Sequence, residues 1–174
     1  MGLTVREKEM RSSLPDNVNL VQLGFFAPEF DLENVQAGRF SLIREIAKGP
    51  LLLYFFSGGW AISCVATLIK VQRIFPEFGK RKGQFAAVSP ESQALTKRLA
   101  ESEGLAFPLL VDADLATTRR YGLLNSKSER PAPYPTFFVI DRERVIRFKR
   151  VVIEEKDRPE LDTLFNELEK YGEF

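Results

Sequence analysis

One cysteine, Cys64, is the residue of this chain whose position best suits it to chemistry. An apolar run at 51–56, with the pattern of a buried strand, precedes it, and a break at 57–60 that contains two glycines separates the two. From Cys64 to Phe78 apolar residues recur with helical spacing, which places the thiol at the start of a predicted helix. Backbone N–H groups and the positive end of a helix stabilise a thiolate there. We therefore expect a reactive sulfur; the alternative is an inert one, because free cysteine is often simply buried.

The absence of histidine excludes several kinds of chemistry. The 174 residues include no imidazole, so neither a Ser-His-Asp triad nor a Cys-His nucleophile pair can form. A zinc site of the Cys/His type cannot be built from one cysteine and no histidine. Carboxylates alone can hold magnesium or calcium, but no ligand spacing for such a site is evident. We expect no metal and no organic cofactor.

Composition is that of an ordinary globular domain, with 44% hydrophobic and 28% charged residues. The formal net charge of +1, without a basic or acidic block, gives no support for binding to nucleic acid. No apolar stretch approaches the roughly 20 residues of a membrane span, and residues 1–14 contain no apolar signal core. One cysteine cannot form an internal disulfide, so we expect a cytoplasmic protein that does not contact membranes.

Pattern and turn residues predict an extension over 1–20, with a short helix at 5–14, and one domain over 21–174. Within the domain we expect a hairpin (30–32 and 39–42), strands at 51–56, 84–89, 107–111, 136–141 and 145–153, helices at 64–78, 91–103, 113–121 and 159–171, and a loop at 123–135. Without the unit at 107–121, the order is β-α-β-α-β-β-α. This order predicts a parallel pair extended by an antiparallel hairpin, with helices on both faces and ligands beyond the carboxyl ends of the parallel strands, where Cys64 falls.

The chain resembles the thioredoxin fold and, within it, the AhpC/TSA family of peroxiredoxin-like redoxins, from Gly24 to the carboxyl terminus. The segments that carry the resemblance are 27–32 (Ala-Pro-Glu-Phe-Asp-Leu), 49–60, Cys64, 112–122 and 133–141 (Pro-Tyr-Pro-Thr-Phe-Phe-Val-Ile-Asp). The resemblance implies an α/β thioredoxin fold of the peroxiredoxin-like kind. Its central mixed sheet is flanked by helices, with an added N-terminal hairpin and an inserted strand–helix unit.

The same resemblance implies thiol-dependent reduction of peroxides. A cysteine thiolate attacks the peroxide, becomes sulfenic acid and is restored by an external thiol such as thioredoxin or glutathione. Cys64 falls on the family's peroxidatic position, and Pro135 falls on the cis-proline of the thioredoxin fold, whose loop faces the sulfur; the alternative for Pro135 is a plain turn before a strand. Homodimerisation is implied by the family as well.

Several positions depart from the family pattern. Ala61 stands where fuller motifs have Thr, Ser or a first cysteine, Ser57 where a proline is expected, and Thr67 where an acidic residue is expected. We interpret Ser57, Ser63 and Thr67 as a turn residue, a helix cap and a helix surface residue rather than as substitute hydroxyls. Trp60 shields the sulfur or is ordinary packing.

The family's arginine just before the late strand is replaced by Tyr134, and the nearest candidate is Arg130 in the loop. Arg119 and Arg120 are interpreted as a solvated helix face. The catalytic set predicted from sequence is therefore Cys64 and Pro135 with Arg130 and Trp60. The alternative function is a redoxin-fold binding or regulatory module that has lost catalysis, which Ala61 and the missing arginine favour. A disulfide reductase is set aside because its dithiol cycle requires a second cysteine.

Overall fold

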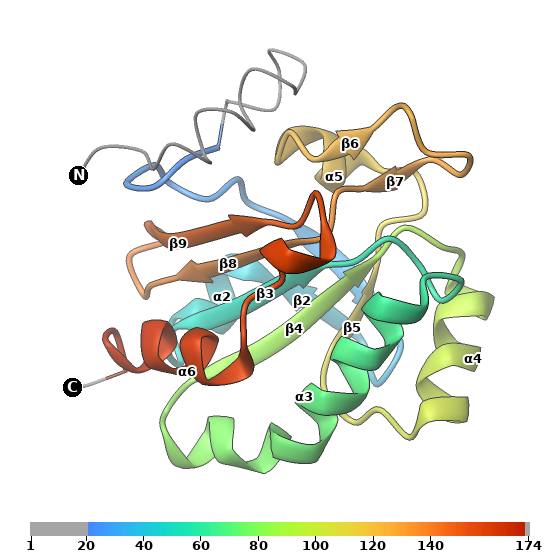
Figure 1. The fold of residues 1–174 in the computed structure, drawn as a ribbon. Helices are drawn as coiled ribbons and strands as arrows, with labels where there is room; N and C mark the ends of the chain where they lie inside the picture. Colours follow the sequence, from blue (N-terminus) through green and yellow to red (C-terminus); the bar gives the residue numbers. More distant parts are fainter. Residues whose placement is uncertain (1–20, 173–174) are drawn as a thin grey trace.

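A seven-stranded mixed sheet forms the centre of the protein, in the strand order β2-β1-β5-β4-β3-β8-β9 (Figure 1). The computed structural model describes residues 21–172. The strands of this sheet are, in chain order, β1 (Asp31–Asn34), β2 (Arg39–Ser41), β3 (Leu51–Phe55), β4 (Gln84–Ser89), β5 (Leu109–Val111), β8 (Thr136–Ile140) and β9 (Ile146–Val151). β3, β4 and β5 run parallel to one another, whereas the other neighbouring pairs are antiparallel.

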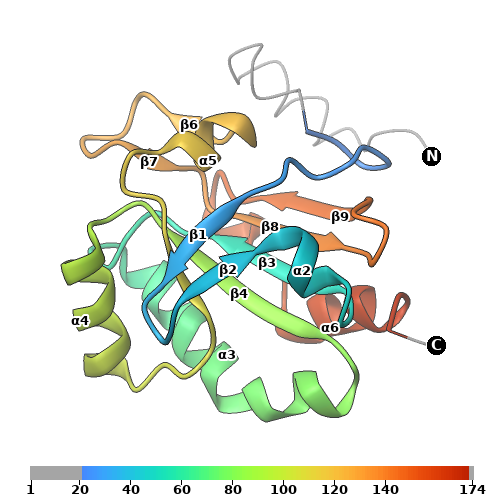
Figure 2. The same cartoon turned by 180° about the vertical axis from the view of Figure 1, so that it is seen from behind.

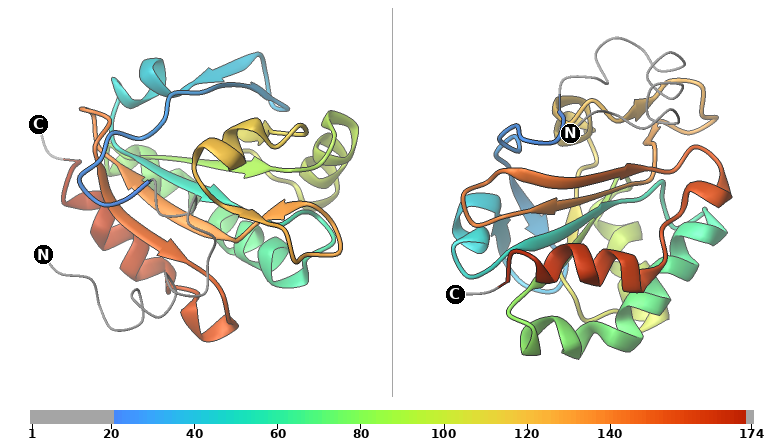
Figure 3. Two further views of the ribbon diagram at one scale, coloured as in Figure 1. Left: turned by 90° about the horizontal axis from the view of Figure 1, so that it is seen from above. Right: turned by 60° about the vertical axis from the view of Figure 1, so that its left-hand side comes forward.

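Helices cover both faces of this sheet. They are α2 (Leu42–Ile46), α3 (Ile62–Lys80), α4 (Gln93–Glu103), α5 (Ala116–Arg120) and α6 (Leu161–Glu169), with a 3-10 turn, η2 (Glu155–Asp157). α3 and α6 lie on one face, called the α3 face below, and α2 lies on the other (Figures 1 and 2). α4 packs beside β5 at the side of the sheet. The segment that joins β9 to α6 passes beside the start of α3 (Figure 3, right).

β3 is buried along its whole length, as its uninterrupted apolar sequence predicted. Because strand side chains alternate between faces, Leu52 and Tyr54 enter the core of the α3 face, while Leu53 and Phe55 enter the core on the opposite face. β4 and β8 alternate in the same way between the two cores. The sheet therefore separates two apolar layers, and the side chains near Cys64 all come from one of them.

The predicted topology is confirmed. β1 and β2 form the N-terminal hairpin, and β8 and β9 form the antiparallel hairpin beside the parallel pair of β3 and β4. The strand–helix unit expected at 107–121 is present as β5 and α5, and β5 lies inside the sheet between β1 and β4. Asp112 lies before α5, and its carboxylate accepts hydrogen bonds from the backbone N–H groups of Thr117 and Thr118 in the first turn of this helix. The predicted extension over 1–20 lies outside the described residues, so the domain boundary stays a prediction.

Two local predictions were wrong. The loop expected at 123–135 contains a small hairpin of β6 (Leu124–Asn125) and β7 (Ala132–Pro133), because β7 is buried and its backbone needs hydrogen-bond partners. In the sequence, Ser89-Pro90 is a plausible cap and first turn for the helix predicted at 91–103, but the cap of α4 is Ser92, whose hydroxyl accepts from Leu95 N at 3.2 Å. Ser89 instead accepts a hydrogen bond from the hydroxyl of Thr96 inside the core.

α3 continues through Pro76 to Lys80, and its last turns leave the axis of its first turns (Figures 1 and 2). Proline removes one helical N–H and clashes with the carbonyl of the preceding turn, which accounts for a bend at this point. The helix therefore continues through the bend and ends at Lys80. Among the described residues, no helix combines the length and the apolarity needed to cross a membrane.

Two glycines give a stability test of this arrangement. A Cβ on Gly49, which leads into β3, would lie 2.4 Å from the backbone oxygen of Lys82, whereas a Cβ on Gly79 in α3 would meet nothing within 4 Å. We expect Gly49→Ala to destabilise the protein by about 1–3 kcal/mol, because two backbones must separate. We expect Gly79→Ala to stabilise it by roughly 0.5 kcal/mol through the reduced entropy of the unfolded chain. Urea unfolding measures both; equal effects would contradict the close approach at Gly49.

Candidate functional site

Cys64 lies in the first turn of α3, as the sequence predicted. The helix begins at Ile62 after the extended residue Ala61, and its first helical hydrogen bond joins Val65 N to Ala61 O at 3.0 Å. The N–H groups of Ile62, Ser63 and Cys64 precede that bond and have no helical carbonyl partner. They give this end of the helix a partial positive charge, which favours an anion at the sulfur.

The turn between β3 and α3 requires glycine at position 58. Gly58 has φ +136°, and a Cβ there would lie 2.5 Å from Trp60 Nε1 and 2.7 Å from Glu91 Oε1. Glu91, which follows β4, also accepts a hydrogen bond from Gly59 N at 3.0 Å. This bond links the turn to the end of β4. Ser57 is a turn residue, as interpreted, and donates its hydroxyl to Pro133 O at 3.2 Å.

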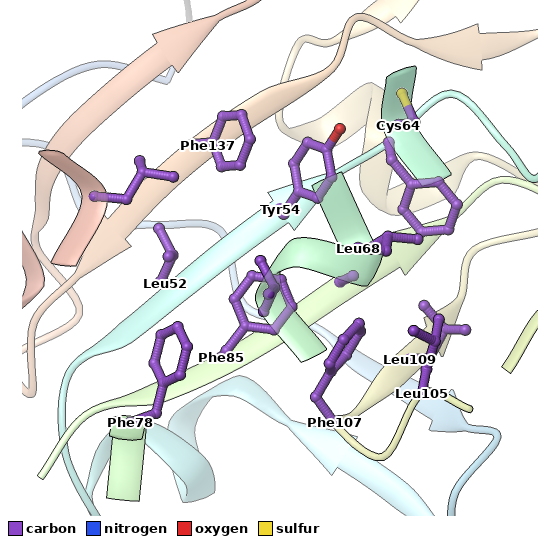
Figure 4. Close-up of a cluster of buried hydrophobic side chains, with 14 of the residues drawn as sticks. Leu52, Tyr54, Cys64, Leu68, Phe78, Phe85, Leu105, Phe107, Leu109 and Phe137 are labelled. Atoms are coloured by element: carbon purple, nitrogen blue, oxygen red, sulfur yellow. The ribbon is translucent and has the colours of Figure 1, made fainter. Parts of the chain in front are cut away.

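The Cys64 side chain is buried, with 2% of the residue exposed, at one end of the apolar cluster on the α3 face (Figure 4). Phe78, Phe85 and Phe107 occupy the far part of this cluster, while the hydroxyl of Tyr54 points to the same side as the sulfur. The phenol of Tyr54 interacts electrostatically with Cys64. The sulfur is therefore enclosed by apolar groups on one side and by a polar group on the other.

That polar side contains an arginine that the sequence did not single out. Arg158 follows η2, and its Nη1 donates to the hydroxyl of Tyr54 at 2.8 Å and to Oγ1 of Thr67 at 3.0 Å. Its Nε and Nη2 each lie 3.3 Å from a carboxylate oxygen of Glu155. The Arg158 side chain is 15% exposed. A guanidinium is thus held beside the thiol by groups from β3, α3 and η2.

A reciprocal capping box fixes the backbone before Arg158. The carboxylate of Asp157 accepts from the backbone N–H of Ile153 at 3.2 Å and of Glu154 at 2.9 Å, and Glu154 in turn caps η2. Asp157 is buried. The turn that presents Arg158 is therefore rigid enough to hold a charged side chain in one place.

The polar groups of this cluster shift one another's pKa values. Burial disfavours the charge of Arg158, but its interactions with Tyr54, Glu155 and Cys64 outweigh burial and raise its pKa. Burial, and then the charge of Cys64, raise the pKa of Tyr54 well above its usual range. The hydrogen bond from Arg158 lowers the pKa of Glu155. At neutral pH the site therefore contains a cationic Arg158, a neutral Tyr54 and an anionic Glu155.

Two interpretations of hydroxyl residues were wrong. Thr67 is 6% exposed and contacts Arg158, so it is not a helix surface residue. It stands where the family pattern has an acidic residue, and both residue types offer an oxygen to the guanidinium. Ser63 does not cap α3, because Ala61 occupies the cap position, and its hydroxyl hydrogen-bonds to Glu155.

Arg130 and Trp60 contact each other. The guanidinium carbon of Arg130 lies 5.6 Å from the centroid of the Trp60 ring, and 43% of Trp60 is exposed. Arg119 and Arg120 are exposed on α5, as interpreted. The guanidinium whose charge interacts with Cys64 is that of Arg158. Sequence reasoning missed it because the stretch 154–158 is rich in charge and resembles a solvated surface.

Pro135 lies directly before β8, whose first residue, Thr136, pairs with Phe55 at the end of β3. The cis peptide bond expected before Pro135 was wrong, since the described residues contain only trans peptide bonds. The trans form is the lower-energy one for most X-Pro bonds. Here it keeps the chain extended, with Tyr134 N bonded to Leu123 O at 2.8 Å and Pro135 O accepting from Val152 N at 2.7 Å.

A mixed sheet with helices on both faces, and one thiol at the start of the helix after the first parallel strand, defines a thioredoxin-fold protein of the thiol-based redoxin class. The sequence pattern of the AhpC/TSA family matches residues 23–149, and the chain belongs to this family. No group of three or more Cys, Asp or Glu side chains within 21–172 is arranged to hold a metal ion.

Curated relatives of this chain include two kinds of thiol protein. It is 26% identical over 128 residues to the thiol-disulfide oxidoreductase ResA of Geobacillus thermodenitrificans, a match that covers 73% of this chain and 68% of ResA. It is 27% identical over 103 residues to peroxiredoxin Bcp of Xanthomonas campestris pv. campestris, covering 59% and 64%, respectively. It is 28% identical over 131 residues to alkyl hydroperoxide reductase E of Mycobacterium tuberculosis, covering 74% and 84%. The match thus spans about two thirds of the length of ResA and of Bcp.

Solved structures of similar fold include peroxiredoxins. Peroxidoxin BcpB of Mycobacterium tuberculosis superposes with a TM-score of 0.76 at 20% identity, covering 86% of this chain and 97% of that one. Enterococcus faecalis AhpC superposes with a TM-score of 0.74 at 19% identity, covering 87% and 92%. These likenesses confirm the predicted thioredoxin fold.

We expect Arg158→Gln to slow alkylation of Cys64 by iodoacetamide at neutral pH by about 10- to 100-fold, the effect of losing a charged hydrogen-bonding partner. Glutamine can still donate to Tyr54 or Thr67, so the fold should be retained. The matched variant Arg130→Gln removes the guanidinium over Trp60 and is expected to slow alkylation less. If Arg130→Gln slowed alkylation more than Arg158→Gln, Arg130 and not Arg158 would be the residue that stabilises the thiolate.

Proposed function

We propose that this protein is a one-cysteine thiol peroxidase that reduces peroxides with an external thiol. The observation that carries the proposal is the placement of Arg158, a partly buried cation held by Tyr54 and Thr67 near the thiol at the start of α3. A cation and free helix N–H groups stabilise a thiolate and the charge that develops on a peroxide oxygen. Each of these features is a recognised way to favour the thiolate of a reactive cysteine.

The relatives support a peroxidase over a disulfide reductase. Bcp and alkyl hydroperoxide reductase E are named for peroxide chemistry, whereas ResA is named for thiol–disulfide exchange. A dithiol cycle within one chain requires two cysteines, and this sequence contains one. Attack on a peroxide requires only one.

The proposed reaction consumes one peroxide and two external thiols. The Cys64 thiolate attacks one peroxide oxygen, an S–O bond forms as the O–O bond breaks, and the departing oxygen takes a proton to become water or an alcohol. An external thiol then displaces water from the sulfenic acid and forms a mixed disulfide. A second external thiol attacks the sulfur of the first external thiol in that disulfide, so that Cys64 is released as a thiol and the two external thiols leave as one disulfide.

The reductant, the assembly and the cellular compartment are proposed from the family. A yeast mitochondrial 1-Cys peroxiredoxin resolves its thiol via glutathione/thioredoxin systems, and its structure superposes with a TM-score of 0.71 at 18% identity, covering 83% of this chain and 74% of that one. We propose thiols of these kinds as reductants, a homodimer as the assembly and the cytoplasm as the compartment. We also propose that Trp60, with Arg130 over its ring, shields the sulfur from water, and that Pro135 forms part of the wall of the site.

Intact mass after dilute hydrogen peroxide, with a sulfenic-acid trap present, tests the proposal. We expect one adduct, located at Cys64 and formed much faster than on free cysteine, and no adduct on Cys64→Ser. In a coupled assay with glutathione or thioredoxin, the natural protein should consume peroxide, while Cys64→Ser should show only the uncatalysed rate.

Equal rates for the natural protein and Cys64→Ser would overturn the peroxidase. The alternative, a redoxin-fold binding or regulatory module, would then remain. It also predicts that iodoacetamide alkylates Cys64 no faster than a free thiol.

A further inference from the structure

The hydroxyl that the family places at position 61 is absent from this chain, yet several hydroxyl groups lie near the start of α3. Each can give its proton to one acceptor only. Thr67 donates to Ser63 O at 3.0 Å, and Ser57 donates to Pro133 O at 3.2 Å. Ser63 hydrogen-bonds to the carboxylate of Glu155, which can only accept when ionised. Each of these three hydroxyls therefore donates its proton to an oxygen atom and not to the sulfur.

Tyr54 is different because of the direction of its bond to Arg158. A guanidinium has donors and no acceptors, so the phenol oxygen must accept the 2.8 Å bond from Arg158 Nη1. The phenol proton then remains for another acceptor. Tyr54 is fully buried, so this acceptor must lie inside the protein, and the buried Cys64 interacts electrostatically with the phenol. Figure 4 shows the phenol oxygen directed toward the side of the cluster where the sulfur lies.

Packing fixes this orientation. The Tyr54 ring stacks on Phe137 with centroids 4.2 Å apart and planes 5° apart, and both residues lie on paired central strands. A donor held by a stacked ring on a central strand needs little reorganisation when charge appears on its acceptor. At neutral pH the phenol retains its proton.

We propose that Tyr54 is a catalytic residue that donates a hydrogen bond to the Cys64 sulfur and supplies, from β3, the hydroxyl that Ala61 lacks. The inference rests on the proposed function, because Cys64 must be the nucleophile for this bond to matter. The bond stabilises the thiolate before attack and holds the sulfur toward Arg158. Arg158 polarises the phenol, which strengthens the donor.

The test compares two conservative variants of fully buried tyrosines, Tyr54→Phe and Tyr121→Phe. Tyr121 donates its hydroxyl to Pro28 O at 2.7 Å in the core on the opposite face, so it controls for the loss of a buried hydroxyl. We expect Tyr54→Phe to slow alkylation of Cys64 by iodoacetamide at neutral pH by about 10- to 100-fold, the effect of one hydrogen bond to a charged group. The ultraviolet band of the thiolate should fall in parallel, and Tyr121→Phe should change neither. Equal alkylation rates for the two variants would overturn the proposal.

Two further comparisons separate donation to sulfur from simple positioning of Arg158. Tyr54→Phe should slow alkylation again in the Arg158→Gln background, whereas a group that acts only through Arg158 would have no further effect. Thr67→Val removes the other hydroxyl that Arg158 contacts and should slow alkylation less than Tyr54→Phe, because the Thr67 proton goes to Ser63 O. An equal or larger effect at Thr67 would count against the proposal. Alkylation needs no peroxide, so these outcomes stand apart from the success or failure of the peroxidase assay.

Discussion

The guanidinium of Arg158 joins three parts of the chain that are distant in sequence: β3 through Tyr54, α3 through Thr67 and η2 through Glu155. Removing a cation from water costs several kcal/mol unless good partners surround it, so this side chain tolerates few alternative positions. The same requirement locates the site, because Tyr54 packs in the same cluster as Cys64 and Thr67 follows Cys64 by one turn on α3. A charge needed for chemistry thus also fixes the geometry around the sulfur.

The site differs from the family pattern in the origin of its polar groups. Where fuller motifs place a hydroxyl on the residue that caps the helix, this chain has Ala61, and the polar groups come instead from a central strand and from the segment after β9. Distribution over several elements makes the site depend on the packing of the sheet against α3. Because interiors are packed densely, the 2% exposure of Cys64 reflects the same apolar cluster that orients Tyr54.

Hydrogen-bond direction limits the role of each neighbouring group more strongly than distance does. Thr67 and Tyr54 both accept from Arg158 Nη1, but only Thr67 has a backbone carbonyl in reach for its own proton. Two hydroxyls at similar distances from one cation therefore act differently. This distinction depends on the donor and acceptor inventory of each side chain, which is fixed by chemistry and not by the fold.

The sequence by itself determined the order of the elements, the buried β3 and the position of Cys64 at the start of a helix, because these depend on local periodicity and turn residues. The family resemblance was carried by the same local segments. Only the tertiary structure decided that Thr67 faces inward, that Arg158 lies beside the sulfur and that 123–135 contains a hairpin. These depend on which distant elements pack together, and a charged stretch such as 154–158 carries no local sign of being folded against a core. The trans bond before Pro135 is flanked by hydrogen bonds to Leu123 and Val152, which lie outside its own segment.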